Sequence, residues 1–97
     1  MNTDLLKRLC EMPGVPGHEE RVRALITSEV SDLFDAIETD AMGSLLCRRD
    51  ATTEDAPKIM LLCHMDEIGF LVSHIDKNGF IYVLPVGGFD PRNLFSR

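Results

Sequence analysis

The chain has 97 residues, 44% of them hydrophobic and 27% charged, which is typical of one small globular domain and too short for two. Its formal net charge of −6 argues against partners that present phosphates, both nucleic acids and anionic membrane surfaces. No apolar run approaches the roughly 20 residues that a membrane-spanning helix needs, and the N-terminus lacks the basic-then-apolar pattern of a secretion signal.

Two helices are predicted in the first third of the chain. The first runs from Leu5 to about Met12, with Thr3 or Asp4 as its N-cap. Pro13 ends it and opens a Pro-Gly-Val-Pro-Gly loop, which is a sharp corner between helices or, alternatively, part of the lining of a substrate cleft. The second helix is expected at about residues 18–34, because apolar side chains recur there at helical spacing.

A β-hairpin is predicted next. Strand candidates at residues 36–39 and 44–48 flank the turn Asp40–Gly43, which has Asp and Gly at the favoured ends of a type I turn. Residues 49–56 are polar and show no periodicity, so an exposed loop is expected there.

The apolar run at residues 59–63 leads directly into His64, Asp66 and Glu67. A short unbroken apolar run predicts a strand buried on both faces. The carboxyl ends of such strands are where open α/β sheets place their active sites. One interpretation is that His64 binds a metal and Asp66 supports it, because histidine is the commonest metal ligand. The alternative is a structural histidine followed by turn residues.

A second hairpin is predicted from residues 68–75 and 80–84, joined through residues 76–79, whose Asn-Gly pair is a strong hairpin signal. Residues 85–91 break the pattern and end in an Asp-Pro turn, and residues 92–97 are too short for an element of their own. A strand buried on both faces needs cover that one substantial helix cannot supply. This arrangement of predicted elements is therefore typical of the first part of a longer fold.

The three cysteines are widely spaced and form no CxxC pair. Their odd number predicts reduced, mostly buried thiols in a cytoplasmic protein and argues against a disulfide framework. A zinc site that draws on Cys47, Cys63, His64 and His74 is conceivable, but the spacing does not support it.

Several segments together resemble the start of the M42 family of metallo-aminopeptidases, which includes glutamyl and tetrahedral aminopeptidases and some members called endoglucanases or cellulases. The most specific segment is Cys-His-Met-Asp-Glu-Ile-Gly-Phe at residues 63–70. The others lie at residues 13–20, 39–44, 79–80 and 87–88.

The resemblance implies an α/β fold: the N-terminal part of a mixed-sheet metallopeptidase catalytic domain at residues 1–70, and the start of an inserted β-rich, PDZ-like oligomerisation domain at residues 71–97. It also implies two divalent metal ions per full-length subunit, zinc or cobalt, with peptides as substrates. Homo-oligomers from dimer to dodecamer are implied as well.

On this resemblance His64 matches the first metal-binding histidine. Asp66 matches a catalytic-site aspartate that orients a histidine ligand or tunes the metal site. The remaining ligands and the general-base glutamate would lie beyond Arg97, so the 97-residue chain alone is expected to be inactive. Two other interpretations stay open: a standalone β-rich module whose strands pair with a partner's edge, and a small structural metal-binding domain that uses the cysteines.

Overall fold

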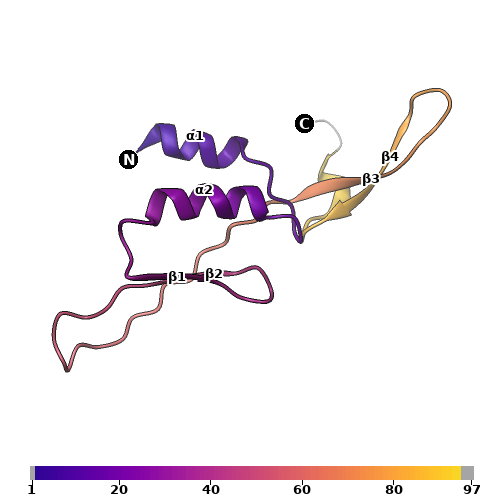
Figure 1. Cartoon of the computed structure of the whole chain (residues 1–97). Helices are drawn as coiled ribbons and strands as arrows, with labels where there is room; N and C mark the ends of the chain where they lie inside the picture. The colour runs from indigo at the N-terminus through magenta and orange to yellow at the C-terminus, as the bar shows by residue number, and fades with distance from the viewer. Residues whose placement is uncertain (1, 95–97) are drawn as a thin grey trace.

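The computed structural model describes residues 2–94, which form an elongated body of 65 × 31 × 23 Å. Two α-helices and a first β-hairpin lie together at one end, and a second hairpin projects at the other (Figure 1). In chain order the elements are α1 (Thr3–Glu11), α2 (Glu20–Val30), β1 (Ala36–Thr39), β2 (Leu45–Arg48), β3 (Gly69–Ile75), β4 (Ile81–Val86) and the 3-10 helix η1 (Pro91–Leu94). The fold is therefore mixed helix and strand, as expected.

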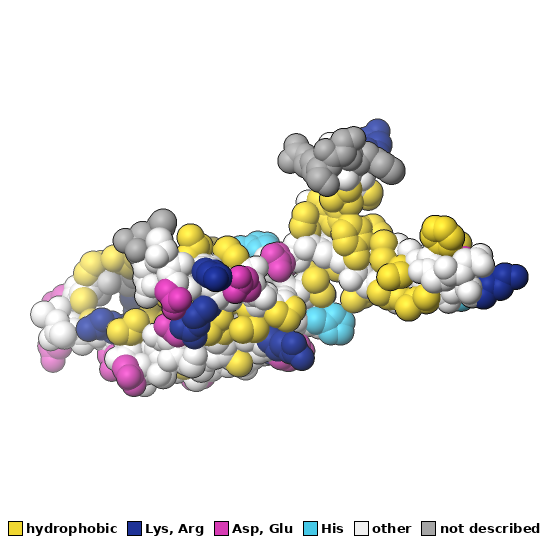
Figure 2. All heavy atoms as spheres, turned by 90° about the horizontal axis from the view of Figure 1, so that it is seen from above, with side chains coloured by type: hydrophobic (Ala, Val, Ile, Leu, Met, Phe, Trp, Pro, Cys, Tyr) yellow, Lys and Arg dark blue, Asp and Glu magenta, His cyan; other side chains and the backbone are white. Residues whose placement is uncertain are grey.

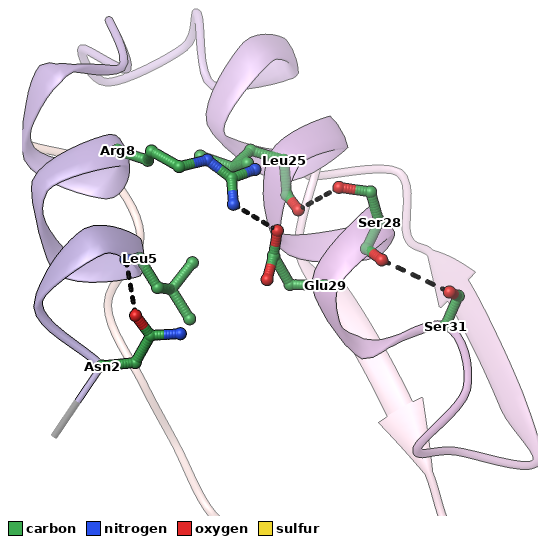
Figure 3. Close-up of polar contacts among 7 residues, drawn as sticks. All are labelled: Asn2, Leu5, Arg8, Leu25, Ser28, Glu29 and Ser31. Atoms are coloured by element: carbon green, nitrogen blue, oxygen red, sulfur yellow. Dashed lines mark hydrogen bonds and ion pairs between the residues drawn. The ribbon is translucent and has the colours of Figure 1, made fainter.

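Helix α1 is capped by Asn2, whose side-chain oxygen accepts a hydrogen bond of 3.1 Å from the Leu5 N–H (Figure 3). The prediction of Thr3 or Asp4 as the cap was wrong, because Asn2 already satisfies a first-turn N–H that has no partner within the helix. The helix ends before Met12, which is extended. A residue before proline is pushed out of the helical region, so Pro13 explains this end.

Helix α2 is shorter at both ends than the predicted 18–34. At its C-terminal end the Ser28 hydroxyl donates to the Leu25 carbonyl at 2.7 Å, and the Ser31 hydroxyl donates to the Ser28 carbonyl at 3.4 Å (Figure 3). Serine side chains that bond to nearby carbonyls compete with the helical backbone. The Leu33 N–H then bonds to the Val30 carbonyl at 2.9 Å, which is a tight turn instead of a further helical turn.

The core is small. Among the described residues, Val22 and Leu25 of α2 are the buried hydrophobic side chains, at 4% and 9% exposure. An ion pair of 2.7 Å between Arg8 of α1 and Glu29 of α2 links the two helices (Figure 3). None of the helices within residues 2–94 is both long enough and apolar enough to cross a bilayer.

The first predicted hairpin is confirmed. Strands β1 and β2 pair antiparallel, with Ala36 opposite Arg48 and Thr39 opposite Leu45. The Asp40 carboxylate accepts hydrogen bonds from the N–H groups of Met42 at 2.9 Å and Ser44 at 2.8 Å, and so holds the turn closed.

The second predicted hairpin is also confirmed, with β3 and β4 antiparallel and a bulge between Val72 and His74. The prediction that Pro85 interrupts the strand was wrong, since β4 continues to Val86 and Pro85 pairs with Phe70. A proline is tolerated here because both strands of a two-stranded sheet are edge strands, where an N–H can be missing.

The predicted strand at residues 59–63 is not formed. These residues belong to no strand, and Ile59, Met60, Leu61 and Leu62 are 80–85% exposed. The prediction of burial on both faces was therefore wrong for this chain. A strand exists only through its ladder partners, and the part of the chain that the structure describes has only two sheets, each of two strands already paired together.

The C-terminal part of the described chain folds back on β3. The Phe89 ring packs edge-to-face against Phe70, with ring centroids 5.6 Å apart. The short helix η1 at Pro91–Leu94 follows, so the expectation that residues 92–97 are too short for an element of their own was wrong as far as residue 94; residues 95–97 lie outside the described part.

Candidate metal centre

His64 and Asp66 lie side by side at the end of the exposed apolar run. The imidazole Nδ1 is 3.3 Å from Oδ1 of Asp66. The His64 side chain is 77% exposed and the Asp66 side chain 31%. With Nδ1 turned toward the carboxylate, Nε2 is the nitrogen available to an outside ligand. A carboxylate beside one ring nitrogen is the usual support of a metal-binding histidine, because it fixes the tautomer and raises ligand basicity.

The segment that follows the pair is fastened to the Pro13–Gly17 loop. The Glu67 N–H donates a hydrogen bond of 2.9 Å to the Gly14 carbonyl. A Cβ built at Gly69 would overlap Cγ1 of Val15, so these two residues are in close contact. The loop thus lies against the segment that carries His64 and Asp66.

A surface depression of about 310 Å³ lies beside the loop and the start of α2, lined by Pro13, Gly14, Val15, His18, Glu20 and Arg21. His64 and Asp66 are not among its lining residues. That the loop lines a substrate cleft therefore stays a prediction.

The donor set is incomplete. Within residues 2–94, no three His, Cys, Asp or Glu side chains come close enough together to hold a metal ion. Zinc sites need three or four protein ligands, whereas this part of the chain offers one candidate ligand, the His64 imidazole, with the Asp66 carboxylate beside it. These two groups fit a metal centre in chemistry and position, but they do not complete one.

The alternative zinc site is wrong for the described residues. The structure does not bring three of Cys47, Cys63, His64 and His74 together. His74 instead lies in the second hairpin beside the Tyr82 ring, with centroids 5.6 Å apart.

The cysteines are free, as predicted, but they are not mostly buried. Cys10 and Cys63 are exposed, and Cys47 is half-buried. Cys63 belongs to the run at residues 59–63, so its exposure has the same cause as that of the run: no neighbouring strand covers it.

Shifted pKa values occur away from the candidate centre. The hydrogen bond from the Ser44 backbone is the largest cause of the lowered pKa of Asp40; desolvation opposes it, and the hydrogen bond from the Met42 backbone lowers the pKa further. The Arg92 side chain lowers the pKa of Asp90, and the same contact raises the pKa of Arg92. Arg92 Nη2 lies 2.6 Å from Asp90 Oδ2, at the start of η1. Both carboxylates have structural roles at turns.

Sequence reasoning singled out His64 and Asp66, whose roles stay predictions, and missed the contacts of Gly14, Val15 and Gly69. Glycine permits close approach of neighbouring groups because it has no Cβ. The glycines at positions 14 and 69 were the available signal of such a close approach. A glycine in the sequence, however, does not indicate which segment approaches it.

The chain is similar to known proteins along nearly its whole length. The sequence model of the family described as M42 glutamyl aminopeptidase matches residues 43–97. A lysyl aminopeptidase of Pyrococcus furiosus is 37% identical over 95 residues, which are 97% of this chain and 27% of that protein.

Solved structures agree. An endoglucanase of Thermotoga maritima is 45% identical, with a TM-score of 0.78 over 90% of this chain and 28% of that one. PhTET1-12s, solved as a dodecamer, is 36% identical, with a TM-score of 0.77 over 100% of this chain and 28% of that one. The chain thus spans little more than a quarter of the length of these relatives.

Proposed function

Because the chain belongs to the M42 glutamyl aminopeptidase family, we propose that it is the N-terminal part of a metal-dependent aminopeptidase that removes N-terminal residues from peptides. The observation that supports this most directly is the His64–Asp66 pair, in which a carboxylate lies 3.3 Å from one imidazole nitrogen and leaves the other nitrogen exposed. The pair lies within the stretch that the family model matches.

In this proposal His64 holds one of two divalent ions, zinc or cobalt, through Nε2. Asp66 would accept a hydrogen bond from the Nδ1–H group, keep the ring in one tautomer and orient it. When bound, such ions polarise the scissile carbonyl and lower the pKa of the attacking water. The remaining ligands and the glutamate that accepts the water's proton belong to the remainder of the polypeptide. The 97 residues alone are therefore inactive.

The proposed domain division places residues 1–70 in the catalytic domain and residues 71–97 at the start of an inserted β-rich, PDZ-like domain. The projecting β3–β4 hairpin supports this division (Figure 1). The dodecameric relative supports a homo-oligomer. We place the protein in the cytoplasm, with peptides as its substrates and with neither nucleic acid nor membrane as a partner.

Metal analysis of the complete protein tests the assignment of His64. His64→Ala should lower the bound metal by about one ion per subunit and abolish release of amino acids from peptide substrates. His74→Ala is the matched control, because His74 lies in the second hairpin beside Tyr82. Unchanged metal content in His64→Ala would contradict the assignment.

Substrate assays test the reaction class. The complete protein should release N-terminal amino acids from unblocked peptides and leave acetylated peptides intact, since an aminopeptidase needs a free amino terminus. A soluble β-glucan belongs in the same assay, because one similar structure is named an endoglucanase. Release of reducing sugar without peptide hydrolysis would overturn the proposal.

A further inference from the structure

The Pro13–Gly17 loop is in close contact on two sides. On one side Gly14 is buried against α2, where a Cβ on Gly14 would lie 2.7 Å from Cγ1 of Val22. On the other side the Gly14 carbonyl accepts the Glu67 N–H at 2.9 Å, and Val15 meets Gly69. Val22 is one of the two buried core side chains. The loop therefore connects the core of the helical part directly to the segment after Asp66.

The loop is well suited to hold a fixed position. The His18 N–H bonds to the Val15 carbonyl at 2.9 Å, with Gly17 at a φ of +81°. This is the geometry of a turn with proline at its second position and glycine at its third, where proline fixes φ in advance. The Glu19 carboxylate also accepts the Gly17 N–H at 2.5 Å. A rigid loop of this kind holds the residues that it contacts in a fixed position.

The contact points lie very close to the candidate ligand pair. Glu67 directly follows Asp66, and Gly69 lies five residues after His64. The exposed run before the pair has no strand partner in the described chain. Within residues 2–94, the loop thus fastens this segment next to the pair, while the pairing of β3 with β4, which begins at Gly69 and Val86, holds its far end.

We propose that the Pro13–Gly17 loop positions the His64–Asp66 pair for metal binding, and that the fit of Val15 against Gly69 sets this position. The inference rests on the proposed function, because it takes His64 as a metal ligand. Val15 and Gly69 are positioning residues, which act on the pair through the segment that they fasten. Groups behind metal ligands typically change metal affinity about 10–100-fold when altered, and a displaced segment should have an effect at the lower end of that range.

A size exchange between the two residues tests the inference in the complete protein. Gly69→Ala introduces a methyl group that overlaps the Cγ1 methyl of Val15. Val15→Ala removes this Cγ1 methyl and so makes room for it. Each single variant should weaken Zn²⁺ affinity, Gly69→Ala by about tenfold, as measured by competition with a chelator. The double variant should recover most of the affinity, because the new methyl fills the vacated space and the two changes are not additive.

Gly88→Ala is the matched control. A Cβ at Gly88 meets nothing within 4 Å, and its φ is not positive, so the same substitution should leave Zn²⁺ affinity unchanged. An equal loss in Gly88→Ala would overturn the inference. So would failure of the double variant to recover affinity. If Gly69→Ala does not fold, Val15→Ala alone decides: undiminished affinity there would also overturn it.

Amide hydrogen exchange separates failure of the inference from failure of the proposed function. The Glu67 N–H, which bonds to Gly14, should exchange slowly in the metal-free complete protein, faster in Gly69→Ala and slowly again in the double variant. Unchanged exchange in Gly69→Ala would overturn the inference even if His64→Ala loses its metal. Full metal content in His64→Ala would instead overturn the proposed function, whatever the exchange shows.

Discussion

Nδ1 of His64 lies 3.3 Å from Oδ1 of Asp66, and the carboxylate is much less exposed than the imidazole, 31% against 77%. Because the Asp66 carboxylate is the less exposed of the two groups, it can hold the imidazole in place. Asp66 is also followed directly by Glu67, whose N–H is bonded to Gly14. The carboxylate therefore has a fixed place from which to orient the ring.

Under the proposed function, Asp66→Ala should weaken metal binding in the complete protein by about 10–100-fold without removing the site, because the proposed ligand His64 remains but its tautomer and orientation are no longer held. Asp66→Asn should lose less metal affinity than Asp66→Ala, since an amide oxygen can still accept a hydrogen bond from the ring. Chelator competition with Zn²⁺ measures both. Glu67→Gln is the control, because the bond seen for Glu67 uses its backbone N–H. Equal affinities in Asp66→Ala and Glu67→Gln would contradict the role of Asp66.

Arg23 fixes the first hairpin to α2. Its Nη1 donates a partly buried hydrogen bond of 2.8 Å to the carbonyl of Gly43, in the turn between β1 and β2. A hydrogen bond from a charged donor contributes about 1.5–3 kcal/mol to stability. Arg23→Ala should therefore lower the free energy of unfolding of the complete protein by roughly 1–2 kcal/mol, measured by urea denaturation.

Arg21→Ala is the matched control for this measurement. Arg21 is an exposed arginine on the same helix, and exposed substitutions usually change stability by less than about 0.5 kcal/mol. The role of Arg23 would be refuted if the two variants unfolded at the same urea concentration.

Asp40 makes the first turn sensitive to acid. Hydrogen bonds from the Ser44 backbone, then from that of Met42, lower the pKa of Asp40 below its ordinary value of 3.8. A carboxylate with a lowered pKa in the folded state stabilises that state at pH values above its unfolded pKa, and this stabilisation is lost as the pH falls through the folded pKa. The turn should therefore stay closed at neutral pH and loosen below about pH 3.8.

The Ser44 amide resonance, followed by NMR between pH 7 and pH 2, measures this change directly, because that N–H is bonded to the Asp40 carboxylate. Asp40→Asn keeps an accepting oxygen but has no proton to gain, so its Ser44 shift should be flat through the acid range. A wild-type titration curve with the same flat shape would refute the prediction.

Local chemistry explains what could be predicted from the sequence. Each hairpin depends on a turn whose residues lie within four or five positions of one another in the sequence, namely the Asp40 turn and the Asn78-Gly79 turn. Both hairpins were predicted correctly. The His64–Asp66 pair is similarly local, with a spacing of two residues. The end of α2 was missed because apolar spacing continues past Val30, whereas the serine hydroxyls that end the helix leave no trace in that pattern.

The other errors concern long-range contacts. An apolar run predicts burial, but whether residues 59–63 are covered depends on neighbouring strands, and the four strands within residues 2–94 pair only with one another. The bond between Glu67 and Gly14 joins segments more than fifty positions apart. Neither relationship follows from periodicity or turn chemistry, which act over a few residues.

The exposed apolar run has a direct consequence for the 97-residue chain on its own. Its side chains at residues 59–62 are at least 80% exposed, and Figure 2 shows further hydrophobic side chains gathered on the β3–β4 hairpin. Both hairpins also have unpaired strand edges. Contiguous apolar surface and open edges drive association, so the isolated chain should self-associate in a concentration-dependent manner in sedimentation velocity.

A single charge on the run tests this cause. Leu61→Lys should shift the association of the isolated chain to higher concentration, because burying an unpaired ammonium group is unfavourable. Met42→Lys is the matched control: Met42 is 88% exposed but belongs to the first turn and not to the run, so this variant should associate like the wild type. In the complete protein we expect further strands to cover the run, so Leu61→Lys should instead lower the unfolding midpoint there. A sedimentation coefficient that does not change with dilution would show that the exposed run does not drive self-association.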